Sequence, residues 1–106
     1  MSLPYAFVCR VEAKPEKADE LAELLRATLP IAQAETGTVH WFALRTSETT
    51  FWVIDTFGSE RARQDHIKGQ IARTLLARAG ELLVAPPEIL PADVLASKQR
   101  SAQTQA

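Results

Sequence analysis

The 106-residue sequence contains no asparagine, only one cysteine and only two histidines. A single cysteine cannot form an internal disulfide, and this set of Cys and His residues is too small for a structural zinc site. No apolar run approaches the roughly 20 residues of a membrane-spanning helix, and residues 1–4 lack the basic and apolar regions of a signal peptide. We therefore expect a cytoplasmic protein without a metal site.

An excess of charge of either sign is also missing, since 12 Lys and Arg face 13 Asp and Glu and the net charge is -1. A nucleic-acid-binding domain depends on many cations that meet phosphates, so this balance argues against one. The length suits a single domain, and 46% of the residues are hydrophobic. We expect one globular domain over residues 1–98, followed by a polar tail over residues 99–106, with no nucleic-acid or membrane partner.

Alternation of apolar residues predicts four strands, at 5–13, 39–45, 50–57 and 88–95. A helical region opens at Pro15, is kinked or ended by Pro30 and stops by Gly37, while a second runs from about residue 60 to 83 and is interrupted near Gly69. Pro91 inside the fourth strand indicates an edge strand or a bulge. The order β-α-β-β-α-β predicts an α+β, ferredoxin-like fold with a four-stranded antiparallel sheet.

Both faces of the predicted strands are apolar. In the third strand, for example, Phe51 and Val53 alternate with Trp52 and Ile54. A sheet with one face in water would alternate apolar and polar residues, and two helices can cover only one face. A second copy of the same sheet is the simplest cover for the other face, so we expect a homodimer.

Several short strings, placed along the predicted elements, resemble the antibiotic biosynthesis monooxygenase superfamily. They are VEAKP at 11–15, ETG at 35–37, DTF at 55–57, RQDHIKGQIA at 63–72 and AGELL at 79–83. The resemblance spans roughly residues 5–98 and implies a dimeric α+β barrel. Members of the superfamily include cofactor-independent monooxygenases that oxidise quinols and polyketide phenols, relatives that degrade haem, and many proteins with no assigned reaction.

The resemblance implies a monooxygenase that oxidises a quinol or a related phenolic substrate with dioxygen and needs no cofactor. Such an enzyme needs an apolar pocket, a base for the phenol and dipoles that stabilise the anion. His66 stands where the family commonly has a histidine before an aliphatic residue, so we predict it as the catalytic base. The alternative is that His66 packs against the helix break near Gly69. His40 is the other available base.

Five further residues are predicted to contact the substrate, namely Trp41, Trp52, Phe42, His40 and Asp55. The two tryptophans have an alternative role as core or dimer-interface anchors. Asp55 has an alternative role in an ion pair with Arg10, because both are charges on apolar, neighbouring strands. Cys9 alternates with apolar residues and is interpreted as a small buried hydrophobe.

The absence of asparagine separates this chain from some relatives. Haem-degrading members and some phenol-oxidising members of the superfamily use an asparagine near the oxygen site, which leaves Gln33, Gln64 or Gln70 as the available amides here. The quinol-oxidising branch therefore fits better than haem degradation. Two alternatives stay open, because fold does not fix function: a non-catalytic dimeric module that binds a small molecule or serves a stress or pathway-accessory role, and another reaction of a phenolic compound, such as isomerisation or decarboxylation.

Overall fold

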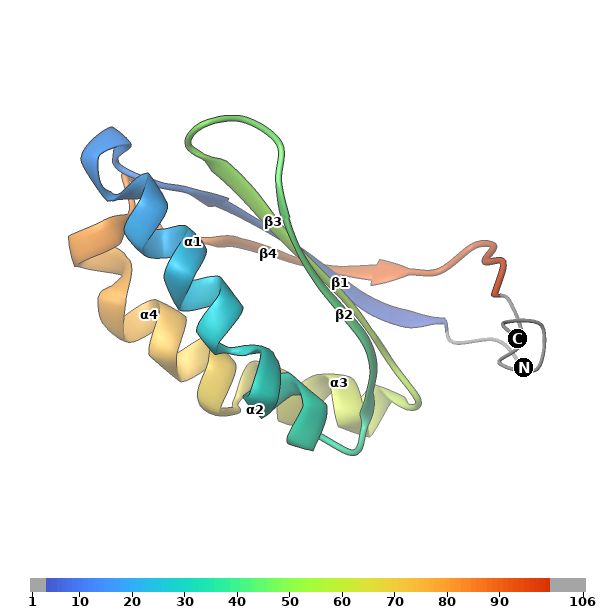
Figure 1. Cartoon of the computed structure of the whole chain (residues 1–106). Helices are drawn as coiled ribbons and strands as arrows, with labels where there is room; N and C mark the ends of the chain where they lie inside the picture. The colour runs from blue at the N-terminus through green and yellow to red at the C-terminus, as the bar shows by residue number, and fades with distance from the viewer. Residues whose placement is uncertain (1–3, 100–106) are drawn as a thin grey trace, which may run out of the picture.

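The computed structural model describes residues 4–99, which form one antiparallel sheet covered on one face by helices (Figure 1). The strand order is β2-β3-β1-β4. Along the chain the elements are β1 (Tyr5–Glu12), the 3-10 turn η1 (Pro15–Lys17), α1 (Ala18–Ala27), α2 (Leu29–Ala34), β2 (Thr38–Arg45), β3 (Thr50–Phe57), α3 (Glu60–Ile67), α4 (Gln70–Leu82) and β4 (Glu88–Asp93). The predicted α+β, ferredoxin-like arrangement is confirmed, and the strand ends differ from the prediction by at most two residues.

Each of the two predicted helical regions is broken once. The first breaks at Thr28, whose hydroxyl donates to the carbonyl of Leu25 over 2.7 Å, and Pro30 follows in the first turn of α2, where its missing N–H costs nothing. That region ends at Ala34, before the predicted stop at Gly37. The second breaks between Ile67 and Gln70, as the glycine there predicts.

The sheet register separates two sets of side chains. Phe7 pairs with Asp55, and both face the helices, whereas Arg10 pairs with Trp52 on the opposite face. The predicted ion pair between Arg10 and Asp55 is therefore wrong, because the two side chains lie on different faces. Arg10 lies 3.0 Å from Glu12 instead.

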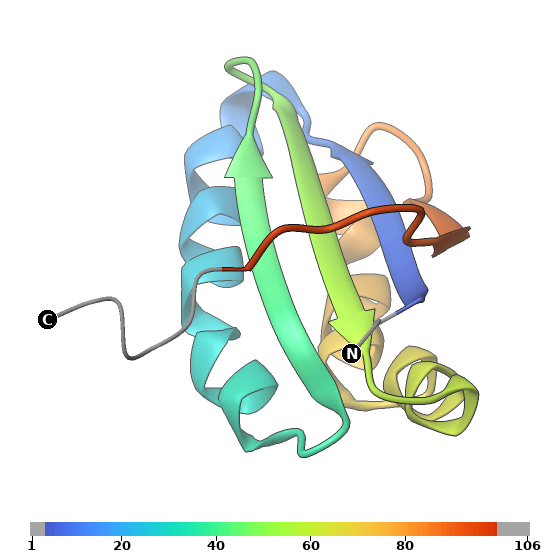
Figure 2. The same ribbon diagram turned by 90° about the vertical axis from the view of Figure 1, so that its right-hand side faces the viewer.

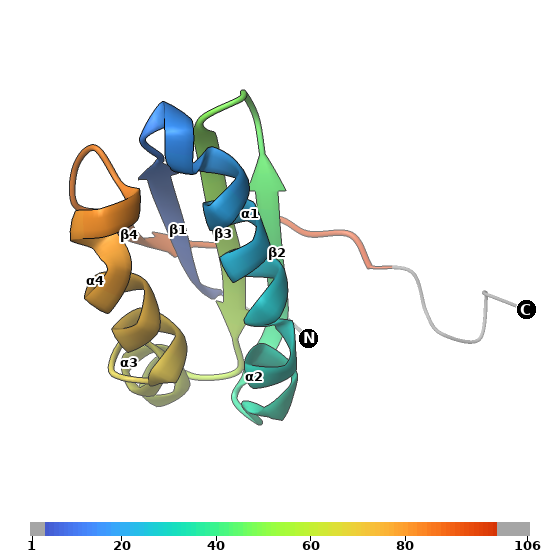
Figure 3. The same cartoon turned by 60° about the vertical axis from the view of Figure 1, so that its left-hand side comes forward.

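The hydrophobic core fills the layer between the sheet and the helices. The pair α1 and α2 and the pair α3 and α4 lie side by side over the sheet (Figure 3). Val11, Leu21 and Leu82 are fully buried there, and Cys9 is buried and forms no disulfide. The interpretation of Cys9 as a buried hydrophobe is confirmed. Among residues 4–99, no helix is long and apolar enough to cross a membrane.

The other side of the sheet, which we call the outer face, carries apolar side chains that no helix of residues 4–99 covers. Phe42 is 53% exposed and Leu90 is 58% exposed, and Ile54 lies between their strands. The chain after β4 crosses the sheet on this side (Figure 2), and the amide nitrogen of Gln99 lies 2.6 Å from Nε2 of His40. Apart from Gln99, the predicted tail at 99–106 lies outside the described residues.

Candidate functional site

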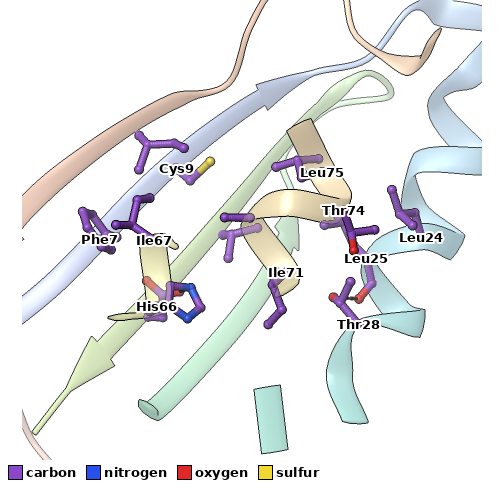
Figure 4. A pocket seen from close by; sticks show the side chains of 14 residues that line it. Phe7, Cys9, Leu24, Leu25, Thr28, His66, Ile67, Ile71, Thr74 and Leu75 are labelled. Atoms are coloured by element: carbon purple, nitrogen blue, oxygen red, sulfur yellow. Dashed lines mark hydrogen bonds and ion pairs between the residues drawn. The ribbon is translucent and has the colours of Figure 1, made fainter. Parts of the chain in front are cut away.

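A cavity of about 50 Å³ lies between α1, α4 and the sheet (Figure 4). Its wall is apolar over most of its area, with side chains from β1, α1, β3, α4 and β4; representative ones are Phe7, Leu25, Val53, Ile71, Leu75 and Ile89. Asp55 and His66 belong to the same wall. The structure therefore brings two of the predicted site residues together in an apolar interior.

His66 is held between two carboxylates. Its Nε2 lies 2.9 Å from Oδ2 of Asp55 on β3, and its Nδ1 lies 2.7 Å from Oε1 of Glu35, which follows α2. The His66 side chain is only 8% exposed, and the Phe57 ring packs 5.0 Å from it, centre to centre. Both ring nitrogens face acceptors, and only the doubly protonated imidazolium can donate to both.

The surroundings of His66 favour its charged form. Burial by itself lowers the pKa of His66, but the hydrogen bonds and negative charges of Asp55 and Glu35 outweigh burial and hold that pKa above its ordinary value. The imidazolium also supplies the counter-charge that the buried Asp55 carboxylate requires. An imidazolium that donates from both nitrogens has no lone pair free to accept another proton.

One carboxylate oxygen of Asp55 has no partner. Asp55 is 2% exposed, and its Oδ2 accepts from His66, whereas its Oδ1 is buried without a hydrogen-bond partner among residues 4–99. A buried unpaired carboxylate oxygen is costly in an apolar interior, so an oxygen left in this state calls for a functional explanation. In this site, a ligand that donates a hydrogen bond would satisfy it.

A second, polar depression lies on the side of His66 that points away from the cavity. This polar hollow, of about 380 Å³, is lined by Glu35, the glycine and threonines that follow it, and the start and end of α3. The Glu35 side chain is 23% exposed and also accepts from the hydroxyl of Thr38 over 2.7 Å. His66 therefore separates the apolar cavity from a surface that water reaches.

Local sequence features bring these groups together. Ser59 caps α3, because its hydroxyl oxygen accepts from the N–H of Ala62 over 3.1 Å, which fixes the start of the helix that carries His66. Gly37 lets the chain after Glu35 approach α3, since a Cβ at this position would lie 2.6 Å from Cβ of Ala62. Gly69 follows the end of α3, and a Cβ at this position would lie 3.4 Å from Oε2 of Glu35. Glu35 had no predicted role, although it opens the ETG string.

The other predicted substrate contacts lie away from the cavity. Trp52, Phe42 and His40 are on the outer face, where Trp52 donates to the Thr46 hydroxyl over 3.0 Å and His40 stacks on Phe42 with ring centres 6.3 Å apart. Trp41 faces the helices, but it lines two surface depressions beside β2 and not the cavity. A direct substrate contact by these four residues stays a prediction, and the cavity does not supply it.

The same cluster is poorly arranged for a metal. Within residues 4–99, no group of three or more His, Cys, Asp and Glu side chains is placed to hold a metal ion. Asp55 and Glu35 approach opposite nitrogens of the His66 ring, so the three side chains do not converge on one point. The arrangement suits proton and hydrogen-bond chemistry.

The fold recurs among solved structures, whereas no family model and no curated protein matches the chain. Protein NE2512 of Nitrosomonas europaea, described as of unknown function, is 44% identical, with a TM-score of 0.89; the match covers 93% of this chain and 96% of that one. A putative antibiotic biosynthesis monooxygenase from the same organism is 14% identical (TM-score 0.78; coverage 90% and 93%). A second one, from Caulobacter crescentus, is 20% identical (TM-score 0.73; coverage 87% and 90%).

Proposed function

Because this chain belongs to the same family as NE2512 and has the fold of the putative antibiotic biosynthesis monooxygenases, we propose that it is a cofactor-independent monooxygenase. Its substrate is a quinol or a related phenol. The observation that carries the proposal is the unpartnered oxygen of Asp55, a residue of the apolar cavity wall that His66 contacts through its other oxygen. This pair places a proton acceptor where an aromatic ring would be desolvated.

The proposed reaction needs no external electron donor. Dioxygen reacts slowly with closed-shell molecules, but an electron-rich phenol that has lost its proton can give an electron to it. For a simple hydroquinone, one oxygen atom enters the ring and the other leaves as water, so hydroquinone and dioxygen give hydroxyquinone and water. The substrate supplies all the electrons, and the protein supplies desolvation, orientation and proton transfer.

The cavity must widen to admit an aromatic ring. Its volume of about 50 Å³ is roughly a third of the ~150 Å³ of an engineered apolar cavity that binds benzene. Leu24 on α1 and Thr74 on α4 line the cavity and are only half-buried. We assign the ring's entry to the gap between α1 and α4, with Leu24 displaced.

We also propose that the functional unit is a homodimer in which two outer faces pack together. The exposed apolar side chains of β2 and β4, together with Ile54 and Trp52 of β3, would then form a shared core. This assigns Phe42 and Trp52 to the interface. A molecular mass of one chain in light scattering at micromolar concentration would contradict this part of the proposal.

Oxygen uptake on addition of an anaerobically reduced naphthoquinol tests the enzymatic proposal, with the spontaneous oxidation of the quinol subtracted. The Asp55→Asn variant keeps the shape of the side chain but cannot take a proton, so we expect uptake to fall about 100-fold or more. Asp93→Asn, a carboxylate change at the exposed end of β4, is the control and should keep full uptake. Binding of the phenol without any protein-dependent uptake would instead support the small-molecule-binding alternative.

A further inference from the structure

We infer that the cavity selects neutral ligands with a hydroxyl or similar hydrogen-bond donor, and that Asp55 Oδ1, not His66, accepts that hydrogen bond and the proton. Glu35 and His66 act as positioning residues behind it. The inference deepens the proposed function and rests on it only for the phenolic identity of the natural ligand. The geometry of three side chains from three segments of the chain carries it.

The choice of acceptor follows from the surroundings of four side chains on the cavity wall: His66, Thr28, Cys9 and Asp55. Both nitrogens of His66 face carboxylates, and the Thr28 hydroxyl donates to the carbonyl of Leu25. Burial and the nearby Asp55 charge raise the pKa of the Cys9 thiol to about 11, so it stays protonated at neutral pH. Asp55 Oδ1 is the carboxylate oxygen on this wall that remains unpaired.

The preference for a neutral donor follows from the charges around the cavity. Facing His66 are Asp55 from β3 and Glu35 from the segment after α2, while Arg61 and Asp65 of α3 lie around the polar hollow. The Asp55 carboxylate and the His66 imidazolium cancel within the cavity wall, and the Glu35 charge lies beyond the ring, toward solvent. A cation would lose its strong hydration on entry and would meet a pair of charges that cancel locally. A neutral phenol loses little hydration and gains a charge-assisted hydrogen bond.

In the proposed step the proton moves from the phenol to Asp55. The phenolic O–H bond breaks, its electron pair stays on the phenolate oxygen, and a new O–H bond forms at Asp55 Oδ1. His66 keeps both of its protons throughout, one toward Asp55 and one toward Glu35. The neutral carboxyl and the adjacent imidazolium then face the phenolate, which stabilises its charge while it reacts.

Phenol and toluene form a matched pair of probes, because they have similar size and only phenol donates a hydrogen bond. Their dissociation constants are measured without oxygen, by chemical-shift changes of the cavity residues, so that no turnover takes place. The ratio of the phenol to the toluene affinity should fall about 10- to 100-fold in Asp55→Asn relative to the wild type, as expected for the loss of a hydrogen bond to a charged group. Asp65→Asn, which removes a carboxylate from the polar hollow but not from the cavity, should leave the ratio unchanged. An unchanged ratio in Asp55→Asn would overturn the inference.

If the wild-type cavity does not open enough for either probe to bind, a second variant provides the test. Leu24→Ala removes a half-buried side chain from the wall and leaves Asp55 and His66 in place, so both probes should then bind. Failure of phenol to bind even this variant would overturn the inference. Benzylammonium should bind at least about 10-fold more weakly than phenol, since it must lose its hydration to enter; tighter binding of the cation would contradict the charge argument.

The state of His66 in the phenol complex separates the two candidate acceptors. In a histidine-labelled sample, the ring nitrogen resonances at neutral pH should report two protonated nitrogens, with and without phenol. One unprotonated nitrogen that shifts on phenol binding would make His66 the acceptor and overturn the inference. Neither the affinity ratio nor the His66 resonances involve oxygen. Phenol binding that depends on Asp55 without any oxygen uptake would therefore remove only the proposed oxidation. Oxygen uptake by the wild type, with an affinity ratio that Asp55→Asn leaves unchanged, would remove only the assignment of Asp55.

Discussion

Nε2 of His66 lies 2.9 Å from Oδ2 of Asp55, and the second oxygen of that carboxylate is buried with no partner. One oxygen is thus fixed by the His66 ring, while the other is buried in a residue of the apolar cavity wall. In the proposed function, this asymmetry leaves one oxygen of Asp55 for a ligand while His66 holds the side chain in position.

The stability of the protein should fall as the pH rises above the ordinary histidine pKa of about 6.5. The pKa of His66 is raised in the folded state, so its stabilising contribution is complete below the unfolded value of about 6.5 and is lost as the pH rises through the folded value. Urea unfolding between pH 5 and 9 measures this loss. Glu35→Gln should cost about 1–2 kcal/mol at pH 6, because a charged acceptor becomes neutral, and should show a smaller further loss with pH. A pH-independent stability of the wild type in this range would contradict the cationic state.

Gly37→Ala should destabilise the protein by about 1–3 kcal/mol through overpacking. The new methyl group would lie 2.6 Å from Cβ of Ala62, and neither backbone can move away without disturbing Glu35 or the cap of α3. Gly58→Ala is the matched control, since no atom lies within 4 Å of its added Cβ. Equal stability of the two variants in urea would show that the approach of these segments is looser than the structure indicates.

The thiol of Cys9 should be unreactive in the folded protein. Its pKa is raised to about 11 and the side chain is buried in the cavity wall, so little reactive thiolate exists at pH 8. Labelling with an aromatic disulfide reagent should be complete in denaturant and very slow without it. Rapid labelling of the folded protein would indicate that the sheet and helices separate at the cavity.

Leu90→Glu should convert the proposed dimer into a monomer, because it places a charge in the middle of an apolar interface. Leu76→Glu is the control: Leu76 is 54% exposed, similar to the 58% of Leu90, but lies on α4 away from the outer face. Light scattering of the two variants gives the mass directly. Two dimers, or two monomers, would contradict the assignment of the outer face.

The fold could be predicted from the sequence because its signals are local. Alternation in residues 50–57 sets a strand with apolar residues on both faces, and Pro91 marks the edge strand that β4 proves to be. The predicted family resemblance agrees with the structural likeness to putative antibiotic biosynthesis monooxygenases, which shows the fold. The first helix was predicted to kink or end at Pro30, but α1 ends at Ala27, because Thr28 closes it through a hydrogen bond that composition does not reveal.

The candidate site could be predicted only in part, because its geometry depends on contacts between distant segments. His66 and Asp55 were named, yet the hydrogen bond between them joins residues on different elements, and Glu35 is 31 positions from His66. The pairing of Asp55 with Arg10 failed because neighbouring strands had been predicted without their register, which decides the face. A substrate contact was predicted for Trp52 from its aromatic side chain, but a sheet with two apolar faces can carry it on the outer face, where Trp52 lies.

The central claim is that this chain inserts oxygen into a phenolic substrate at the Asp55 cavity, and labelled dioxygen tests it most directly. A reduced naphthoquinol is oxidised under ¹⁸O₂ with the wild type, Asp55→Asn or Asp93→Asn, and the ¹⁸O content of the products is measured by mass spectrometry. The account predicts one labelled oxygen atom per product molecule with the wild type and Asp93→Asn, and only the spontaneous level with Asp55→Asn. Product without label, or equal labelling with Asp55→Asn, would contradict it.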